Sequence, residues 1–218
     1  VALQSGIYRV ISQQDYLNRI NVFPIADSDT GTNLNLSLSA ALPFLAGDNE
    51  KPLGQLLIAT ADVLLDNARG NSGAIFAQFF QGLSDSVGDS TELTPESFAA
   101  AAVVGSEYAR AALSRPREGT ILSAISAFAE ALSRQVATSP HAKFSAQLHL
   151  ASQAAHAAVE KTQMQLDVLK KAGVVDAGAK GFAELLGGFS DYLSTGEQST
   201  KPELTVLDEL LPALEISA

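Results

Sequence analysis

The sequence predicts an all-α protein, and three observations support this prediction. Apolar residues recur every three to four positions along most of the 218 residues, which is the period of an amphipathic helix. No alternating run of apolar and polar residues reaches the length of a strand. Alanines cluster at 99–102 and 154–158, where small side chains would let neighbouring helices approach closely. We therefore expect a bundle of helices with essentially no sheet.

The helices can be placed in order along the chain by their apolar stripes and their start signals. The stripes that each put apolar residues on one helical face lie at 7–17, 53–63, 75–83, 121–136, 148–169 and 182–193. A further helix is marked by Thr94, which precedes a proline in the first turn, and it should run toward Leu113 before Pro116. Ser139-Pro140 separates the next two stripes, and the last stripe ends shortly before Gly196.

The most informative loop covers residues 21–33 and reads NVFPIADSDTGTN. Asp27 and Asp29 lie two residues apart beside a proline, so they belong to an irregular segment rather than to adjacent turns of a helix. A hard cation such as Mg²⁺ would neutralise their repulsion and keep positions open for water and substrate phosphates. Thr30 or Thr32 would then cap the following helix and leave backbone N–H groups for an anion. The loop predicts a site for metal and phosphate, although this pair of aspartates taken alone is more typical of a solvated turn.

Two well-known ion and phosphate motifs do not fit the sequence. An EF-hand loop counted from Asp27 would require Asp or Asn, Gly and Glu at positions where this chain has Gly, Thr and Leu. A Walker A motif would require Lys where Ala179 stands and Ser or Thr after Lys180. Calcium sensing and a P-loop are therefore both disfavoured.

Three further polar or glycine-rich segments precede predicted helices. Gly70 and Gly73 permit positive φ and close backbone approach, while Ser72 and free N–H groups offer phosphate contacts. A C-cap followed by a turn explains these glycines equally well. These glycines belong to the first segment, 67–73, and the other two segments lie at 117–120 and 173–181. Each signal is weak alone, but together they indicate one rim of a bundle where loops converge on an anionic ligand.

Four segments in order resemble the motif set of the Dak2 family, and they read NVFPIADSDTGTNLNLSLSAAL, DNARGNSGAIFAQFFQGL, PREGTILSAISAFAEAL and AGVVDAGAKGFAELL. That family includes the nucleotide-binding L domain of dihydroxyacetone kinases and the kinase subunit of bacterial fatty-acid kinase. The first segment is more similar to the fatty-acid-kinase branch, whose motif reads NVFPVPDGDTGTN. Ser28 replaces its glycine and Ala26 a proline, and the lost backbone freedom at Ser28 is expected to alter metal affinity. The resemblance extends from about Gly6 to about Leu193.

The resemblance implies an up-and-down barrel of about eight helices that binds ATP or ADP at one end through two Mg²⁺ ions. It assigns metal binding to Asn21, Asp27 and Asp29, with catalytic roles for the two aspartates. Dihydroxyacetone kinases have an aspartate at the position of Asn21, so this ligand would be weaker here. The nucleotide-binding positions that the resemblance implies are Thr30, Gly31, Thr32, Asn33, Gly70, Asn71, Ser72, Gly73, Thr120, Asp176 and Gly178. Arg69 is a candidate for stabilising transferred charge, and a plain surface residue is an equally good interpretation.

The resemblance also implies an activity, namely transfer of the γ-phosphate of ATP to a fatty acid presented by a DegV-type carrier protein or domain. Two alternatives stay open: phosphate transfer to a small carbonyl compound such as dihydroxyacetone on a carrier, and a nucleotide-binding adaptor without turnover. Residues 1–196 would form the Dak2-type barrel. Residues 197–218 would form a linker or short amphipathic segment leading to a further domain.

Composition narrows the class of protein further. The net charge of −10 should repel nucleic acid and anionic membranes, and no apolar run has the length of a membrane span. The sequence contains no cysteine, so a disulfide framework and thiolate metal sites are excluded. No secretory signal is visible, and a cytoplasmic location is therefore expected. A homodimer is left open.

Overall fold

The structure, a computed structural model, describes residues 1–46 and 52–202, which form eleven helices and no strand. The all-α prediction is confirmed. The helices are α1 (Ala2–Ser12), α2 (Gln14–Ile20), α3 (Thr30–Ser39), α4 (Leu42–Ala46), α5 (Leu53–Asp66), α6 (Gly70–Val87), α7 (Pro95–Ala111), α8 (Ile121–Thr138), α9 (Phe144–Gln165), α10 (Asp167–Ala172) and α11 (Ala177–Thr195). Eight of them have ten residues or more, which agrees with the expected number.

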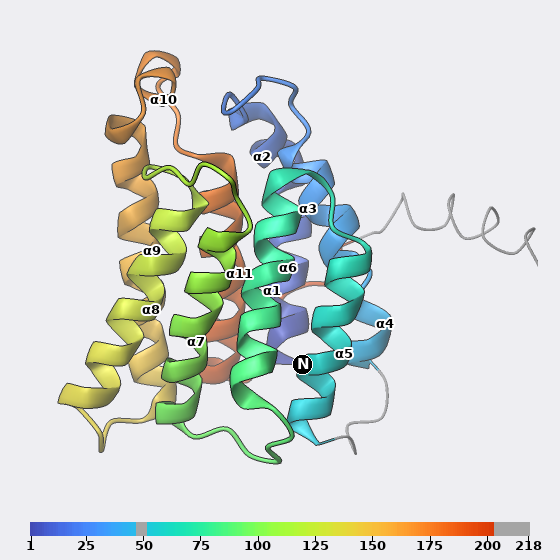
Figure 1. Cartoon of the computed structure of the whole chain (residues 1–218), viewed down its shortest axis with the longest axis vertical. Helices are drawn as coiled ribbons and strands as arrows, with labels where there is room; N and C mark the ends of the chain where they lie inside the picture. Colours follow the sequence, from blue (N-terminus) through green and yellow to red (C-terminus); the bar gives the residue numbers. More distant parts are fainter. Residues whose placement is uncertain (47–51, 203–218) are drawn as a thin grey trace, which may run out of the picture.

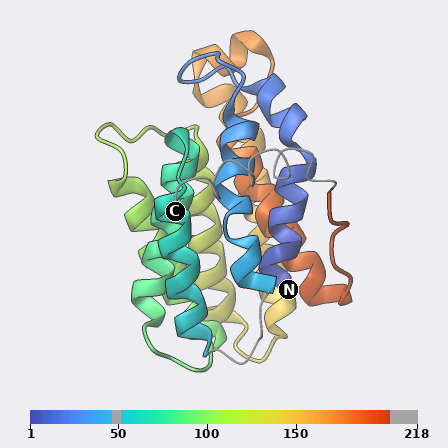
Figure 2. The same cartoon turned by 90° about the vertical axis from the view of Figure 1, so that its right-hand side faces the viewer.

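The long helices alternate in direction and close into a ring (Figures 1 and 2). Packing passes from α1 to α11, then through α8, α7, α6 and α3, and returns to α1. The first and last helices of the ring therefore lie side by side, as Figure 2 shows for the blue and red ends of the chain. This arrangement is an up-and-down helical barrel, as predicted.

Aromatic side chains fill the interior of the ring. Phe182 of α11 meets Phe76 and Phe79 of α6 and Phe128 of α8 edge to face, with ring centroids 5.2–6.0 Å apart. All four rings are buried, and such edge-to-face pairs add to the hydrophobic stabilisation of a core. The core ties together helices that are far apart in the sequence, and it holds the ends of those helices in register.

Two boundaries differ from the sequence prediction. The stripe at 7–17 is divided at Gln13 into α1 and α2. The stripe at 148–169, predicted as one long helix, is divided at Leu166, whose backbone is extended (φ −120°, ψ 126°). The chain then turns into α10 with Leu169 fully buried, so the apolar period continues across a break in the helix.

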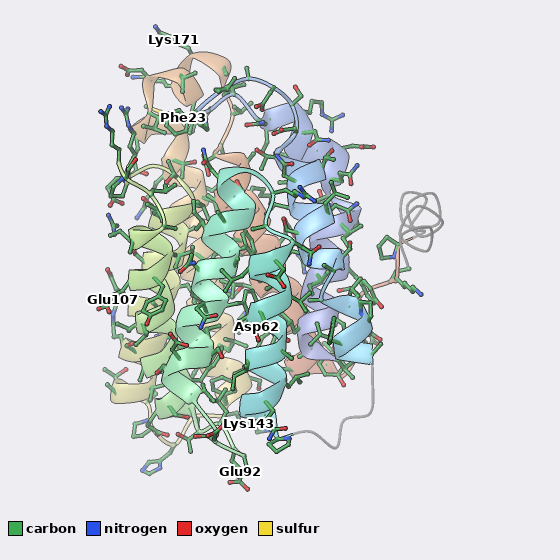
Figure 3. The ribbon with its side chains drawn as sticks, turned by 45° about the vertical axis from the view of Figure 1, so that its right-hand side comes forward. Phe23, Asp62, Glu92, Glu107, Lys143 and Lys171 are labelled. Atoms are coloured by element: carbon green, nitrogen blue, oxygen red, sulfur yellow. The ribbon has the colours of Figure 1, made fainter. Side chains whose placement is uncertain are left out.

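The alternation of helix directions places four helix N-termini at the same end of the barrel. These are the first turns of α3, α6, α8 and α11, at the top of Figure 1. Figure 3 shows Phe23 of the α2–α3 loop at this end with Lys171, whereas Glu92 and Lys143 lie at the opposite end. Among the described residues, no helix is both long and apolar enough to cross a membrane.

Candidate functional site

Two adjoining cavities lie where the four helix N-termini meet. The acidic cavity, of about 190 Å³, is lined by Asp27 and Asp29. The basic cavity, of about 280 Å³, is lined by Arg115 and Arg117. The residues shared by both linings are Phe23, Pro24, Thr30, Asn71 and Ser72. The two cavities therefore form one continuous candidate site.

The acidic loop between α2 and α3 presents two carboxylates with different surroundings. Asn21 is buried at the end of α2, and its Nδ2 donates a hydrogen bond to Asp27 Oδ1 at 2.7 Å. Asp29 occupies the N-cap position of α3, yet its side chain makes no capping hydrogen bond. Its carboxylate is thus available to a ligand, while the Asp27 carboxylate is held in place by the amide of Asn21.

Ser28, between the two aspartates, has a left-handed backbone with φ 57°. This conformation costs a non-glycine residue about 1 kcal/mol, whereas glycine adopts it freely. The glycine in the fatty-acid-kinase motif at this position therefore has a conformational reason, and the serine here adopts the same turn at a cost.

Three residues predicted to bind phosphate also lie at contacts between helices. Thr32 bonds to Asn18 of α2 twice, through its N–H and its Oγ1, both at 3.0 Å. A Cβ on Gly31 would overlap the carbonyl oxygen of Gln14 in α2. A Cβ on Gly73 would lie 2.6 Å from Ser37 Oγ in α3. None of the three lines either cavity.

The first turn of α6 forms the opposite wall of the acidic cavity. Gly70 has φ 59°, and a Cβ there would lie 2.8 Å from Asn33 Nδ2, so both predicted residues meet at this point. Like α3, α6 has no side chain capping its N-terminus. In α3 only the N–H of Thr32 already has a side-chain acceptor, Asn18 Oδ1. First turns without an N-cap hydrogen bond have free N–H groups and carry the positive end of the helix dipole, which suits an anion. Asn71 and Ser72 follow in the same turn and line both cavities.

Arg69 does not line either cavity. It is exposed at the N-cap position of α6, where its backbone N–H donates to Ser37 Oγ at 2.9 Å. The surface interpretation of this side chain therefore agrees better with its position.

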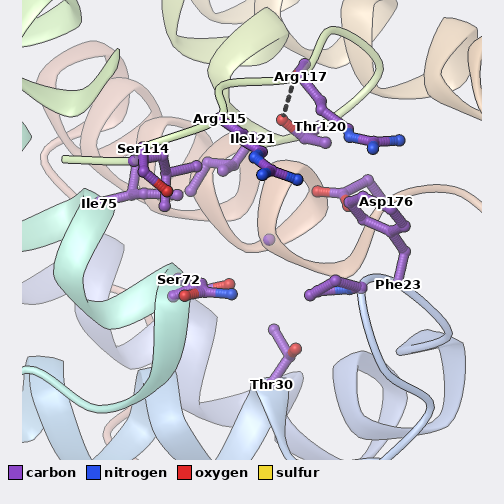
Figure 4. A pocket seen from close by; sticks show the side chains of 14 residues that line it. Phe23, Thr30, Ser72, Ile75, Ser114, Arg115, Arg117, Thr120, Ile121 and Asp176 are labelled. Atoms are coloured by element: carbon purple, nitrogen blue, oxygen red, sulfur yellow. Dashed lines mark hydrogen bonds between the residues drawn. The ribbon is translucent and has the colours of Figure 1, made fainter. Parts of the chain in front are cut away.

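The first turns of α8 and α11 form the remaining walls, and both have side-chain caps (Figure 4). Thr120 accepts from the N–H of Leu122 at 3.4 Å and donates to the carbonyl oxygen of Arg117 at 2.7 Å. Asp176 Oδ1 accepts from the N–H of Ala179 at 2.8 Å. A Cβ on Gly178 would lie 2.9 Å from Ser72 Oγ, so the glycine lets α11 approach α6 closely.

Burial gives Asp176 unusual electrostatics. The side chain is almost inaccessible, and this desolvation raises the pKa of Asp176 to about 6, despite hydrogen bonds from the backbone of Ala179 and Ile121 that lower it.

The oxygen donors at the acidic cavity fit a magnesium ion better than a closed metal centre. Asp27 and Asp29 offer charged oxygens, and Asn21 offers an amide oxygen. Within residues 1–46 and 52–202, no three His, Cys, Asp or Glu side chains gather as a metal-binding group. Two carboxylates with open positions suit Mg²⁺, which keeps several waters and shares its coordination with substrate phosphates.

Sequence reasoning missed Arg115 and the apolar walls of the site. Leu113, Ile75 and Ile121 line the basic cavity, and Ile25 lines the acidic one. Ile75 and Ile121 belong to the helical stripes of the core, so their sequence pattern does not distinguish them, whereas Ile25 lies in the α2–α3 loop. The two arginines flanking Pro116, directly before a predicted helix start, were the signal that could have identified Arg115.

Comparisons with known proteins identify the family of the chain. The family model described as "DAK2 domain" matches residues 24–191. The chain is 32% identical over 206 residues to YloV of Bacillus subtilis, covering 94% of this chain and 36% of that protein. It is 36% identical over 210 residues to the MG369 homolog of Mycoplasma pneumoniae, an uncharacterized protein, covering 91% of this chain and 36% of that one.

A third relative is the uncharacterized protein SAUSA300_1119 of Staphylococcus aureus, 32% identical over 206 residues, with coverage of 94% of this chain and 37% of the relative. The chain spans about a third of the length of these curated relatives. With the family model covering most of the chain and an all-α barrel carrying its motifs at one end, the chain belongs to the Dak2 domain family.

Proposed function

We propose that this chain is the nucleotide-binding domain of a Mg-ATP-dependent kinase. The single observation that carries the proposal is the meeting of Asp27 and Asp29 with the uncapped first turns of α3 and α6 around one cavity. Carboxylates that can hold Mg²⁺ then face N–H groups that can bind phosphate oxygens. The relationship of the Dak2 family to a dihydroxyacetone kinase subunit supports a kinase-like nature.

The acceptor that we propose is a fatty acid presented by a DegV-type carrier protein or domain. Support comes from the first motif, which is more similar to the fatty-acid-kinase branch than to the dihydroxyacetone kinases. In the reaction, a carboxylate oxygen of the fatty acid forms a bond to the γ-phosphorus of ATP. The bond from that phosphorus to the β–γ bridging oxygen breaks, and the products are an acyl phosphate and ADP.

The roles of the residues follow from phosphoryl-transfer chemistry, in which positioning and charge neutralisation account for most of the catalysis. Asp27 and Asp29, with the amide oxygen of Asn21, would bind two Mg²⁺ ions, and the Nδ2 of Asn21 orients Asp27. Magnesium supplies positive charge at the β- and γ-phosphates. The N–H groups of α3 and α6, together with Ser72, would fix the phosphate chain. The nucleoside would occupy the basic cavity beside Thr120 and the α11 N-terminus.

Phosphate transfer from labelled ATP tests the proposal directly. The purified chain is combined with a DegV-type protein loaded with fatty acid and, in parallel, with dihydroxyacetone and its carrier. We expect an acyl phosphate only in the first reaction. Transfer to dihydroxyacetone alone would instead establish the small-carbonyl alternative. Nucleotide binding without transfer in either reaction would indicate an adaptor.

The variant Asp29→Ala tests the metal assignment. Loss of a ligand carboxylate should weaken Mg-dependent ATP binding at least about tenfold. Helical circular dichroism should hardly change, because the loop adds little to the core. Titration calorimetry with and without Mg²⁺ measures this effect. Asp62→Ala, which removes an exposed aspartate on α5 away from the site, is the matched control (Figure 3). An ATP affinity of Asp29→Ala equal to that of the control would show that Asp29 does not bind the metal.

A further inference from the structure

The loop between α7 and α8 carries two arginines over the basic cavity. Arg115 and Arg117 are both exposed residues of this loop, and both line the cavity. Figure 4 shows Arg115 extending toward the middle of the cavity and Arg117 at its rim, across from Ser72 and Thr30. The two arginines therefore line the basic cavity, which Asp27 and Asp29 do not line.

Neither guanidinium is neutralised by an ion pair within the described residues, which contain salt bridges of Arg9, Arg110 and Lys180 only. Glu118, the acid closest in sequence, pairs instead with Arg110 at 2.7 Å. Two uncompensated cations over a cavity are notable in a chain whose net charge is −10. A guanidinium presents forked donors that match phosphate oxygens, so an anionic ligand is the expected partner.

Hydrogen bonds between the end of the loop and the start of α8 hold the loop backbone in place, so the backbone that carries the arginines is ordered before a ligand binds. Glu118 Oε2 accepts from Ser123 Oγ at 2.7 Å, and the same Oγ accepts from the N–H of Gly119 at 2.9 Å. The Thr120 hydroxyl bonds to the carbonyl oxygen of Arg117. Pro116, between the two arginines, restricts the backbone further. Ordering a loop in advance lowers the entropy cost of binding.

We propose that Arg115 and Arg117 bind phosphate oxygens of the nucleotide from the basic cavity, without the help of a metal ion. This inference rests on the proposed function, because it takes a nucleoside polyphosphate as the ligand. The phosphate chain would pass the residues that both cavities share, Thr30, Asn71 and Ser72, which lie between the carboxylates and the arginines. The arginines then make the affinity depend on the number of phosphates.

Binding measurements on Arg115→Gln, Arg117→Gln and the double variant test this proposal. Arg134→Gln is the matched control, because Arg134 is exposed on α8 and lines neither cavity. Dissociation constants are measured for ATP, ADP, AMP and adenosine, with Mg²⁺ and with EDTA, at several salt concentrations. The double variant should bind ATP at least about tenfold more weakly, with adenosine affinity unchanged. The ATP affinity of the double variant should also depend less steeply on salt concentration. Its loss of ATP affinity relative to the wild type should be larger in EDTA than with Mg²⁺.

Three results would overturn the proposal while leaving the proposed function intact. In the first, the double variant and the control bind ATP with equal affinity. In the second, the double variant loses as much affinity for adenosine as for ATP. In the third, the nucleotide affinity is unchanged but the KM for the loaded carrier rises. The last result would assign the arginines to the acceptor. A wild-type chain that binds no nucleotide at all would overturn the proposed function together with this inference.

Discussion

At the scale of single residues, Asp176 combines a structural task with a position at the site. Its carboxylate caps α11 through the N–H of Ala179, and its own N–H donates to Thr162 Oγ1 at 3.0 Å. It also lines the basic cavity beside Gly178. A cap that is this deeply buried stays in place when a ligand arrives, so Asp176 fixes the first turn of α11 rather than moving with the ligand. Because the side chain is buried away from water, ionisation of this carboxylate is unfavourable.

Replacing Asp176 by Asn should change how stability depends on pH. The folded-state pKa of Asp176 is raised from 3.8 to about 6, so its contribution to stability is fully present below pH 3.8 and is lost as the pH rises to about 6. Asn keeps a capping oxygen and does not titrate. The stability of Asp176→Asn relative to wild type should therefore rise by on the order of 2 to 3 kcal/mol between pH 4 and pH 7.

Urea unfolding at closely spaced pH values measures this difference. Asp62→Asn on the exposed face of α5 serves as the control, and its difference from wild type should stay flat over the same range. A flat difference for Asp176→Asn as well would show that Asp176 has an ordinary pKa in the folded chain.

At the scale of elements, the site depends on how α3 is seated against α2. Asn18 of α2 bonds to both the N–H and the hydroxyl of Thr32, and Gly31 lies directly against the backbone of α2. These contacts aim the first turn of α3 at the acidic cavity. The Thr-Gly-Thr portion of the motif therefore acts on the site through helix packing, while Asp29 and Thr30 face the cavity itself.

Gly31→Ala should separate α3 from α2. The new Cβ would overlap the carbonyl oxygen of Gln14 and lie 2.9 Å from Asn18 Oδ1, and backbone atoms of a packed helix cannot move aside cheaply. We expect a loss of about 2 to 3 kcal/mol in the free energy of unfolding and weaker nucleotide binding. Gly196→Ala is the control: it has open space and an αL backbone (φ 77°, ψ −1°), so it should cost about 1 kcal/mol and leave binding unchanged. A smaller loss for Gly31→Ala than for Gly196→Ala would contradict this account of the packing.

The elements also show what the sequence could and could not predict. Apolar period and start signals identified the long helices, and four helix starts with polar residues indicated one shared rim. The sequence alone could not show whether a glycine serves a phosphate-binding turn or a close contact between helices. Gly31 and Gly73 have the residue type that phosphate turns use, yet they are required for helix contacts with Gln14 and Ser37. Arg115 and Arg117 flank Pro116 directly before a helix start, but that local pattern does not show that tertiary packing brings them to the cavity.

At the scale of the whole molecule, the barrel closes where α1 meets α11. Gly188 of α11 lies against the backbone of Ser5 and Gly6, so small residues allow close approach. Past the end of α11, Ser199 N–H donates to Ser5 Oγ at 2.9 Å, which brings the segment after Gly196 back onto α1. We propose that the barrel ends near this point. Of the linker or short amphipathic segment predicted at 197–218, residues 203–218 lie outside the described residues.

The contact between α1 and α11 also contains the ion pair of Arg9 and Glu184. Arg9 Nε lies 2.6 Å from Glu184 Oε2, and Lys180 Nζ lies 2.7 Å from Oε1 of the same carboxylate. Burial of Glu184 raises its pKa, but the hydrogen bonds from Lys180 and Arg9 outweigh this effect and leave the pKa below its ordinary value. A partnered buried carboxylate contributes stability that depends on both of its partners.

Arg9→Gln should therefore destabilise the barrel at neutral pH by about 2 kcal/mol, less than for a fully buried pair because Lys180 remains and Arg9 is about a third exposed. Since the folded pKa of Glu184 is lowered, the stability from this pairing is present above its unfolded value and is lost as the pH falls through the folded value. The loss of stability caused by Arg9→Gln should thus become smaller in acid.

Denaturant unfolding at pH 7 and below pH 4 measures this loss. Arg110→Gln is the control, because the Arg110 pair with Glu118 is exposed and should contribute at most about 0.5 kcal/mol. Equal penalties for the two variants, or an Arg9→Gln penalty that stays constant in acid, would mean that hydrophobic packing of α1 against α11 closes the barrel without this ion pair.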